Sequence, residues 1–158
     1  MKVGRDVVVD WYFMDDFDTG EKFWVDSNGL EMVRKQLFFR REYAYQQNNT
    51  ISANYYPMTS AIGIRDLNET TPAQKEKLKT MQKQIVIQND RSQGASAGLR
   101  GRRNIEIMQN RRFKIHDHYG VVQPLNDLDE FGRGIKATNK YKMFITNIAG
   151  PSTKQKSK

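Results

Sequence analysis

The chain has 158 residues, with 26 Lys and Arg against 18 Asp and Glu, and a formal net charge of +8. This length allows one domain and excludes a multidomain enzyme, and 37% hydrophobic residues are too many for a disordered chain. No apolar run approaches the roughly 18–20 residues that a membrane helix needs, so we expect no membrane span. The absence of Cys excludes a disulfide scaffold, a thiolate metal site and a cysteine nucleophile.

The positive charge is concentrated in three segments. Residues 74–83, 99–112 and 150–158 carry net charges of +3, +4 and +3, so the rest of the chain is slightly acidic. The N-terminal sequence lacks the apolar run of a signal peptide. Nucleic-acid modules usually interleave Arg with aromatic residues, and the arginines from 91 to 103 have no aromatic residue among them. Nucleic-acid binding through residues 99–112 is therefore a minor hypothesis.

The predicted elements are mostly short strands rich in β-branched and aromatic residues. In chain order they cover residues 6–13, 22–25, 31–45, 61–65, 84–88, 104–108 and 140–148. The 31–45 stretch is also compatible with an amphipathic helix, but its aromatic residues favour a strand. Pro72 near a first turn predicts a helix from Thr71 to about Lys83. Residues 92–101 and 127–134 are predicted to be Gly-containing loops.

Many short strands joined by turns predict an all-β protein, most simply a β-sandwich with one short Lys-rich helical insertion. We expect a single sandwich segment over residues 1–149, with the insertion at about 67–84. Residues 150–158 are expected to be a disordered basic tail.

Two kinds of catalytic or metal-binding chemistry are conceivable. His116 and His118 flank Asp117 and would share one face of an extended segment, but a zinc site needs further ligands from elsewhere. Paired carboxylates could serve in glycoside hydrolysis, yet all of them lie in turn-like polar stretches where solvated acids are the default: Asp15, Asp16, Asp127, Asp129 and Glu130. We therefore expect no catalytic residue, no metal ligand and no cofactor in this chain.

Five stretches form a recognisable series. Residues 23–32 read F-W-V-D-S-N-G-L-E-M, residues 53–60 read A-N-Y-Y-P-M-T-S, and residues 90–94 read D-R-S-Q-G. Residues 105–112 read I-E-I-M-Q-N-R-R, and residues 123–126 read Q-P-L-N. In this order the series resembles motifs of glycoside hydrolase family 38, the lysosomal-type α-mannosidases. The resemblance extends over about residues 20–126.

The resemblance implies that the chain corresponds to part of the C-terminal β-sandwich region of a zinc-dependent retaining α-mannosidase. That enzyme would hydrolyse terminal α-mannose of glycans, with its zinc ligands and nucleophile in an N-terminal α/β domain that this chain lacks. The implied partners are that catalytic domain and, through it, the glycan; the chain alone would be inactive. The implied compartment is the lysosome, the vacuole or the secretory pathway, for which the sequons at Asn48 and Asn68 are thin support.

The resemblance assigns a structural or domain-interface role to residues in three motif loops: Asp26, Ser27, Asn28, Gly29, Asn54, Tyr55, Tyr56, Pro57, Asp90, Arg91, Ser92, Gln93 and Gly94. Asn28-Gly29 is expected to turn a hairpin, Pro57 to lie at a strand end, and residues 90–94 to form a tight inter-strand loop. Where the family has D-D-x-R-G, this chain has H-D-H-Y-G, so Tyr119 replaces the arginine and is predicted at the periphery of the sugar pocket.

An alternative is a noncatalytic carbohydrate-binding or interaction β-sandwich. Trp11, Trp24 or the Tyr55/Tyr56 pair would then stack on sugar rings, although their strand context favours burial. A sandwich taken from a larger protein is also expected to leave sheet edges exposed and to self-associate when it is alone.

Overall fold

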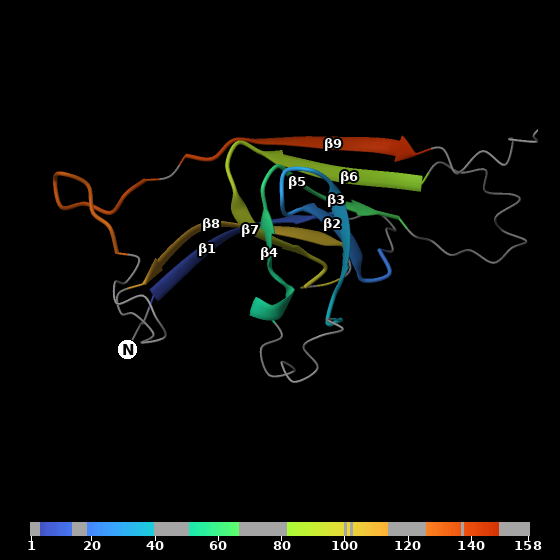
Figure 1. Cartoon of the computed structure of the whole chain (residues 1–158), viewed down its shortest axis with the longest axis horizontal. Helices are drawn as coiled ribbons and strands as arrows, with labels where there is room; N and C mark the ends of the chain where they lie inside the picture. The colour runs from blue at the N-terminus through green and yellow to red at the C-terminus, as the bar shows by residue number, and fades with distance from the viewer. Residues whose placement is uncertain are drawn as a thin grey trace, which may run out of the picture.

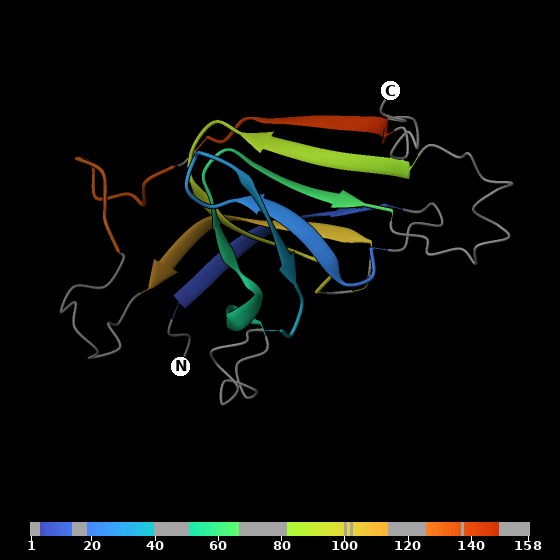
Figure 2. The ribbon, with the colours of Figure 1, turned by 45° about the vertical axis from the view of Figure 1, so that its right-hand side comes forward.

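The structure, a computed structural model, describes residues 4–13, 19–39, 51–66, 82–99, 101, 103–113, 126–136 and 138–148. Within these ranges the chain forms two antiparallel sheets that pack face to face (Figures 1 and 2). The four-stranded sheet has the order β1-β8-β7-β4, and the five-stranded sheet has the order β3-β2-β5-β6-β9. The predicted all-β sandwich is confirmed.

The nine strands of the described ranges are β1 (Gly4–Tyr12), β2 (Lys22–Asp26), β3 (Met32–Gln36), β4 (Tyr56–Met58), β5 (Ala61–Arg65), β6 (Gln82–Asn89), β7 (Gln93–Ala97), β8 (Asn104–Phe113) and β9 (Tyr141–Ile148). A single 3₁₀ turn, η1 (Ser52–Asn54), precedes β4.

The core lies between the two sheets and is built from alternate strand residues. Every second side chain of a strand points to the same face, and these positions are apolar in both sheets. The buried hydrophobic cluster consists of Phe23, Val25, Leu37, Met58, Ile62, Ile64, Ile85, Ile87, Ala95, Ala97, Ile105 and Ile107. Trp11 and Tyr141 pack against this cluster from the side.

Six predicted strands are confirmed: β5 with the predicted ends, and β1, β2, β6, β8 and β9 with shifted ends. The predicted 31–45 strand is too long: β3 ends at Gln36, where buried Leu37 and Phe38, with φ +56°, form a turn. The predicted helix does not reach Lys83, because Gln82 and Lys83 already belong to β6. Residues 40–50, 67–81 and 149–158 lie outside the described ranges, as do the rest of that helix and the basic tail.

Two strands were not predicted. β7 lies inside the segment expected to be a loop. Q-G-A-S-A was not predicted as a strand because it contains no large apolar side chain, yet its two alanines pack deep in the core. β4 has three residues with Pro57 in the middle. Proline donates no ladder hydrogen bond, and β4 tolerates it because it is the edge strand of its sheet.

Two of the connections between the two sheets are short arches. Residues 59–60 connect β4 in one sheet to β5 in the other, and residues 90–92 connect β6 to β7. The two arches are joined, since the backbone N–H of Asn89 donates to the carbonyl of Ser60 at 3.1 Å. This end of the sandwich carries the motif loops.

Candidate functional site

Asp26 is the buried anchor of the loop between β2 and β3. Its Oδ1 accepts the backbone N–H groups of Asn28 at 3.3 Å and Gly29 at 2.6 Å, and its Oδ2 accepts the hydroxyl of Ser60. The Ser60 hydroxyl, with the loop N–H groups, lowers the pKa of the Asp26 carboxyl against the opposing effect of burial. Asp26 therefore ties the β2–β3 hairpin to the β4–β5 arch as an ionised group.

The β2–β3 turn confirms the hairpin predicted from Asn28-Gly29. Asp26 pairs with Met32, so the loop has five residues, and Gly29 takes a positive φ of +77° that suits glycine. Asn28 Oδ1 accepts the backbone N–H of Leu30 at 2.9 Å and so closes the turn. The Ser27 hydroxyl is buried without a hydrogen-bond partner in the part of the chain that the structure describes.

Residues within or bordering three motif segments, 23–32, 53–60 and 90–94, meet at one end of the sandwich. The backbone N–H of Thr59 donates to the carbonyl of Asp26 at 2.7 Å, and Asn89 Nδ2 donates to the carbonyl of Met58 at 3.3 Å. Together with the Asp26–Ser60 and Asn89–Ser60 bonds, these contacts connect segments that lie about thirty residues apart. Segments that each resemble a separate motif thus form one hydrogen-bonded unit.

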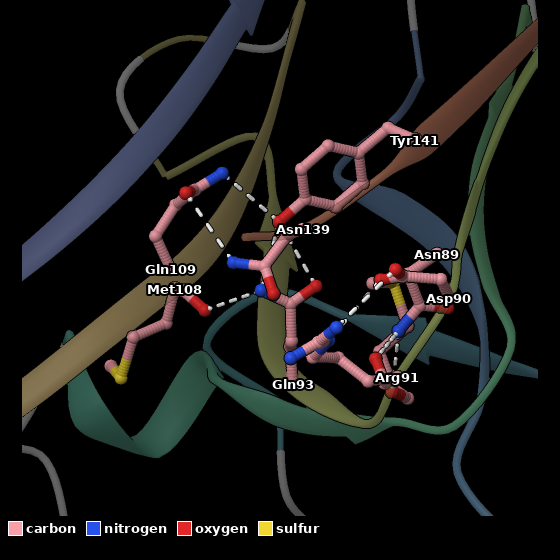
Figure 3. Close-up of polar contacts among 9 residues, drawn as sticks. Asn89, Asp90, Arg91, Gln93, Met108, Gln109, Asn139 and Tyr141 are labelled. Atoms are coloured by element: carbon pink, nitrogen blue, oxygen red, sulfur yellow. Dashed lines mark hydrogen bonds and ion pairs between the residues drawn. The ribbon is translucent and has the colours of Figure 1, made fainter. Parts of the chain in front are cut away.

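Gln93 and Tyr141 form the polar centre of this end (Figure 3). Gln93 Nε2 donates to the carbonyl of Met108 at 3.1 Å and to the Tyr141 hydroxyl at 2.8 Å, and Gln109 Nε2 donates to the same hydroxyl at 3.1 Å. Burial raises the pKa of the Tyr141 phenol, with the Gln93 hydrogen bond acting against it. Gln93 therefore fastens β7 to β8 and to β9.

Asp90 and Arg91 form the exposed tip of the second arch. The backbone N–H of Lys140, followed by the Arg91 side chain, lowers the pKa of the Asp90 carboxyl against the opposing effect of burial. Arg91 Nε lies 3.4 Å from Asp90 Oδ1, a solvated ion pair that contributes little to stability. The arch is thereby attached to the start of β9. Ser92 is exposed beside it.

The N-Y-Y-P segment lies against both sheets. Asn54 is buried, and its Oδ1 accepts the backbone N–H of Phe38 at 2.8 Å. The Tyr55 ring approaches Gly94, and its hydroxyl donates to buried Glu106 at 2.7 Å. Tyr56 instead packs edge-on against Phe23 with ring centres 5.7 Å apart. Tyr55 and Tyr56 therefore serve packing on opposite faces of the four-stranded sheet.

A groove of about 390 Å³ opens on the outer face of the five-stranded sheet, beside the Asp26 loop. Trp24 and Gly63 are register partners that line it, and Gly63 is buried with Val86 packed closely over it. The Arg65 guanidinium lies 4.7 Å over the Trp24 ring, and its Nε donates to Gln84 Oε1 at 2.6 Å. The groove therefore combines an aromatic ring with planar hydrogen-bonding groups.

The predicted acidic candidates within the described ranges take no part in the hydrogen bonds of this end. Asp129 accepts backbone N–H groups of its own turn and pairs with Arg133 at 3.0 Å, while Asp127 and Glu130 are exposed. Trp11 packs edge-on against Tyr141 at 5.3 Å, so it is not a stacking platform. Asp15, Asp16, Asn48, Asn68, His116, Asp117, His118 and Tyr119 lie outside the described ranges.

Within the described ranges, no cluster of three or more His, Asp or Glu side chains could hold a metal ion. No helix among the same residues is long and apolar enough to cross a membrane.

Sequence reasoning missed the residues that hold the loops together, namely Asn89, Gln109 and Tyr141. It also missed a buried polar group on β8, where Asn104 Nδ2 donates to Asp10 at 2.9 Å and to Glu106 at 3.1 Å. The available signal was the alternation of polar Asn104 and Glu106 with Ile105 and Ile107 in a strand predicted to be half-buried.

Comparison with known proteins places the chain beside α-mannosidases. It is 28% identical over 144 residues to the lysosomal alpha-mannosidase of Mus musculus, covering 89% of this chain and 12% of that protein. It is 33% identical over 119 residues to the lysosomal alpha-mannosidase of Felis catus, covering 75% of this chain and 10% of that protein. An alpha-mannosidase of Arabidopsis thaliana is 28% identical over 133 residues.

No family model matches the chain. The chain spans about a tenth of the length of the curated relatives it matches. Its homologues are thus alpha-mannosidases of mammals and plants, and the similarity is to one small segment of each.

Proposed function

We propose that this chain is the C-terminal-region β-sandwich of a zinc-dependent retaining α-mannosidase of glycoside hydrolase family 38. The proposal rests on the convergence of the motif loops: Asp26, Ser60 and Asn89, from three separate motif segments or their borders, bond to one another at one end. An end fixed by hydrogen bonds between distant segments is suited to present a rigid surface to a neighbouring domain.

In this proposal the chain is a structural partner of the catalytic domain. The family resemblance assigns zinc, the nucleophile and the acid/base carboxylate to the N-terminal α/β domain, and no group of three or more His, Asp or Glu side chains among the described residues could hold a metal ion. The substrate is terminal α-mannose of glycans, reached through that domain. The compartment is the lysosome, the vacuole or the secretory pathway, in keeping with the names of the mammalian relatives.

The proposal is tested with a chimera of the mouse lysosomal alpha-mannosidase whose aligned segment is replaced by this chain. We expect a folded chimera that hydrolyses a chromogenic α-mannoside, whereas the isolated chain does not. A matched chimera carrying Ser60→Ala should lose thermal stability, because the Asp26 carboxylate loses its hydroxyl partner. Zinc-dependent hydrolysis by the isolated chain, or a folded chimera without activity, would contradict the proposal.

A second candidate function, carbohydrate binding by the groove, is favoured by one observation. Trp24 lines the groove with Gln84 and Glu31, with the Arg65 guanidinium over one face of its ring, and sugar rings are commonly held by an aromatic face with planar polar groups around it. The chain has two Trp residues, so Trp11→Phe leaves Trp24 as the sole indole reporter. Saturable fluorescence change of this variant with a mannoside, absent from the Trp24→Phe variant, supports binding; no change in either variant rejects it.

A further inference from the structure

The four edges of the two sheets differ in how they are protected from pairing with another chain. Unpaired edges attract foreign strands, and natural proteins protect them with charge, proline, short length or bulges. β3 carries Arg34 and Lys35, β4 has three residues with a proline, and β1 has an irregular register between Val7 and Val8. β9 has none of these protections over its central residues.

β9 is paired along one side only. All eight of its residues have partners in β6, from Tyr141 opposite Asn89 to Ile148 opposite Gln82. No other strand of the described ranges pairs with it, and in both ribbon views it forms the outer margin of the five-stranded sheet (Figures 1 and 2). Within the described part of the chain, its second row of backbone N–H and C=O groups therefore faces no other strand along eight residues.

Both faces of this strand are apolar and exposed at its centre. Met143, Phe144 and Ile145 are 41%, 43% and 68% exposed. Met143 and Ile145 face the same side as Ile87 and Ile85, whereas Phe144 faces the other side with Val86. A strand added at this edge would thus bury apolar side chains on both faces as well as satisfy the backbone.

We propose that β9 is the interface through which two copies of this chain pair antiparallel, joining their five-stranded sheets into one. The strand is self-complementary about a two-fold axis at Phe144. In that register Met143 faces Ile145 of the second copy and Lys142 faces Thr146, so no lysine opposes a lysine. An edge of this length is a small interface, so the dimer is weak and concentration-dependent. The inference is independent of the proposed function.

The experiment compares the whole chain with two lysine variants by sedimentation velocity, from low micromolar to submillimolar concentration. We expect the mass to rise from 18.4 kDa to twice that value. Ile145→Lys should weaken dimerisation by about tenfold or more, because it places a charge in the apolar pairing. The matched control is Ile135→Lys, the same substitution at a 58% exposed isoleucine outside the strands, which should leave the dimer unchanged.

Circular dichroism and a cooperative thermal transition show whether each variant remains folded, and Phe144→Lys repeats the test on the other face. Hydrogen exchange should show concentration-dependent protection in β9. A monomer throughout, a dimer that survives Ile145→Lys, or an equal loss in Ile135→Lys would overturn the proposal. Open-ended aggregation of the parent chain would overturn the two-fold arrangement.

Discussion

At the scale of the residue, Asp26 illustrates how a single carboxylate can hold two distant loops. Ser60, whose hydroxyl donates to Asp26, lies thirty-four residues further along the chain. The backbone N–H groups of the loop donate to the other carboxylate oxygen. Every one of these donors favours the ionised form, which is why the pKa is lowered although the side chain is almost completely buried. The Asp26 carboxylate therefore stabilises the folded state only at pH values at which it is ionised.

Ser60→Ala should reduce the stability of the fold in a pH-dependent way. The folded-state pKa of Asp26 lies below 3.8. The stabilisation by the ionised carboxylate is therefore present above pH 3.8 and is lost as the pH falls from 3.8 through the lower folded-state pKa. We expect the variant to melt at a lower temperature than the parent at neutral pH, with the difference shrinking once the pH falls below 3.8 and the Asp26 carboxylate becomes protonated. Ser92→Ala, at an exposed serine of the neighbouring arch, is the matched control. A difference that stays constant down to low pH would contradict this assignment.

At the scale of the element, prediction succeeded where alternation was strong. β5 (A-I-G-I-R) and β6, with its central Q-I-V-I-Q, place isoleucine at every second position, and both are interior strands of the sheet. β7 gave no such signal, because its inward positions are alanines that leave room for larger side chains from β5 and β8. A local sequence pattern shows which side chains a segment carries. It does not show how much space the neighbouring strands leave for those side chains in the core.

The candidate site shows the same limit. The Asp26–Gly29 turn was predictable, since its hydrogen bonds are local and its glycine has a positive φ. The bonds from Ser60 to Asp26 and from Gln93 to Tyr141 join different strands, and only the packing of the two sheets brings them together. Their residue types are ordinary, so no sequence pattern distinguished them.

The turn that links β7 to β8 provides a prediction at this scale. Gly98 has φ +81°, and a Cβ there would lie 2.8 Å from Leu37 Cδ1, inside the core. Gly94 lacks a positive φ, and its Cβ would make ordinary contacts with Tyr55 and Met108. Gly98→Ala should therefore cost about 1–3 kcal/mol in urea unfolding, whereas Gly94→Ala should be close to neutral. Equal effects of the two substitutions would show that β7 is not held as described.

At the scale of the whole molecule, the sandwich offers two distinct surfaces that share one strand. β9 carries the apolar edge, and the residues at its start contact the motif end, since Lys140 donates its backbone N–H to Asp90 and Tyr141 bonds to Gln93. In the antiparallel pairing proposed for β9, Asn147 of the second copy would lie opposite Tyr141, next to the Asp90 arch.

The net charge of +8 opposes pairing of two copies, and part of it is removable. Residues 151–158 follow β9 closely in sequence and contain three lysines, so truncation after Gly150 lowers the net charge to +5. We expect the truncated chain to dimerise a few-fold more tightly at low salt, because Coulomb repulsion between copies falls. The two chains should converge at about 1 M salt, where charges are screened within about 3 Å. Sedimentation at both salt concentrations measures this, and weaker dimerisation of the truncated chain would mean that the tail itself makes the contact.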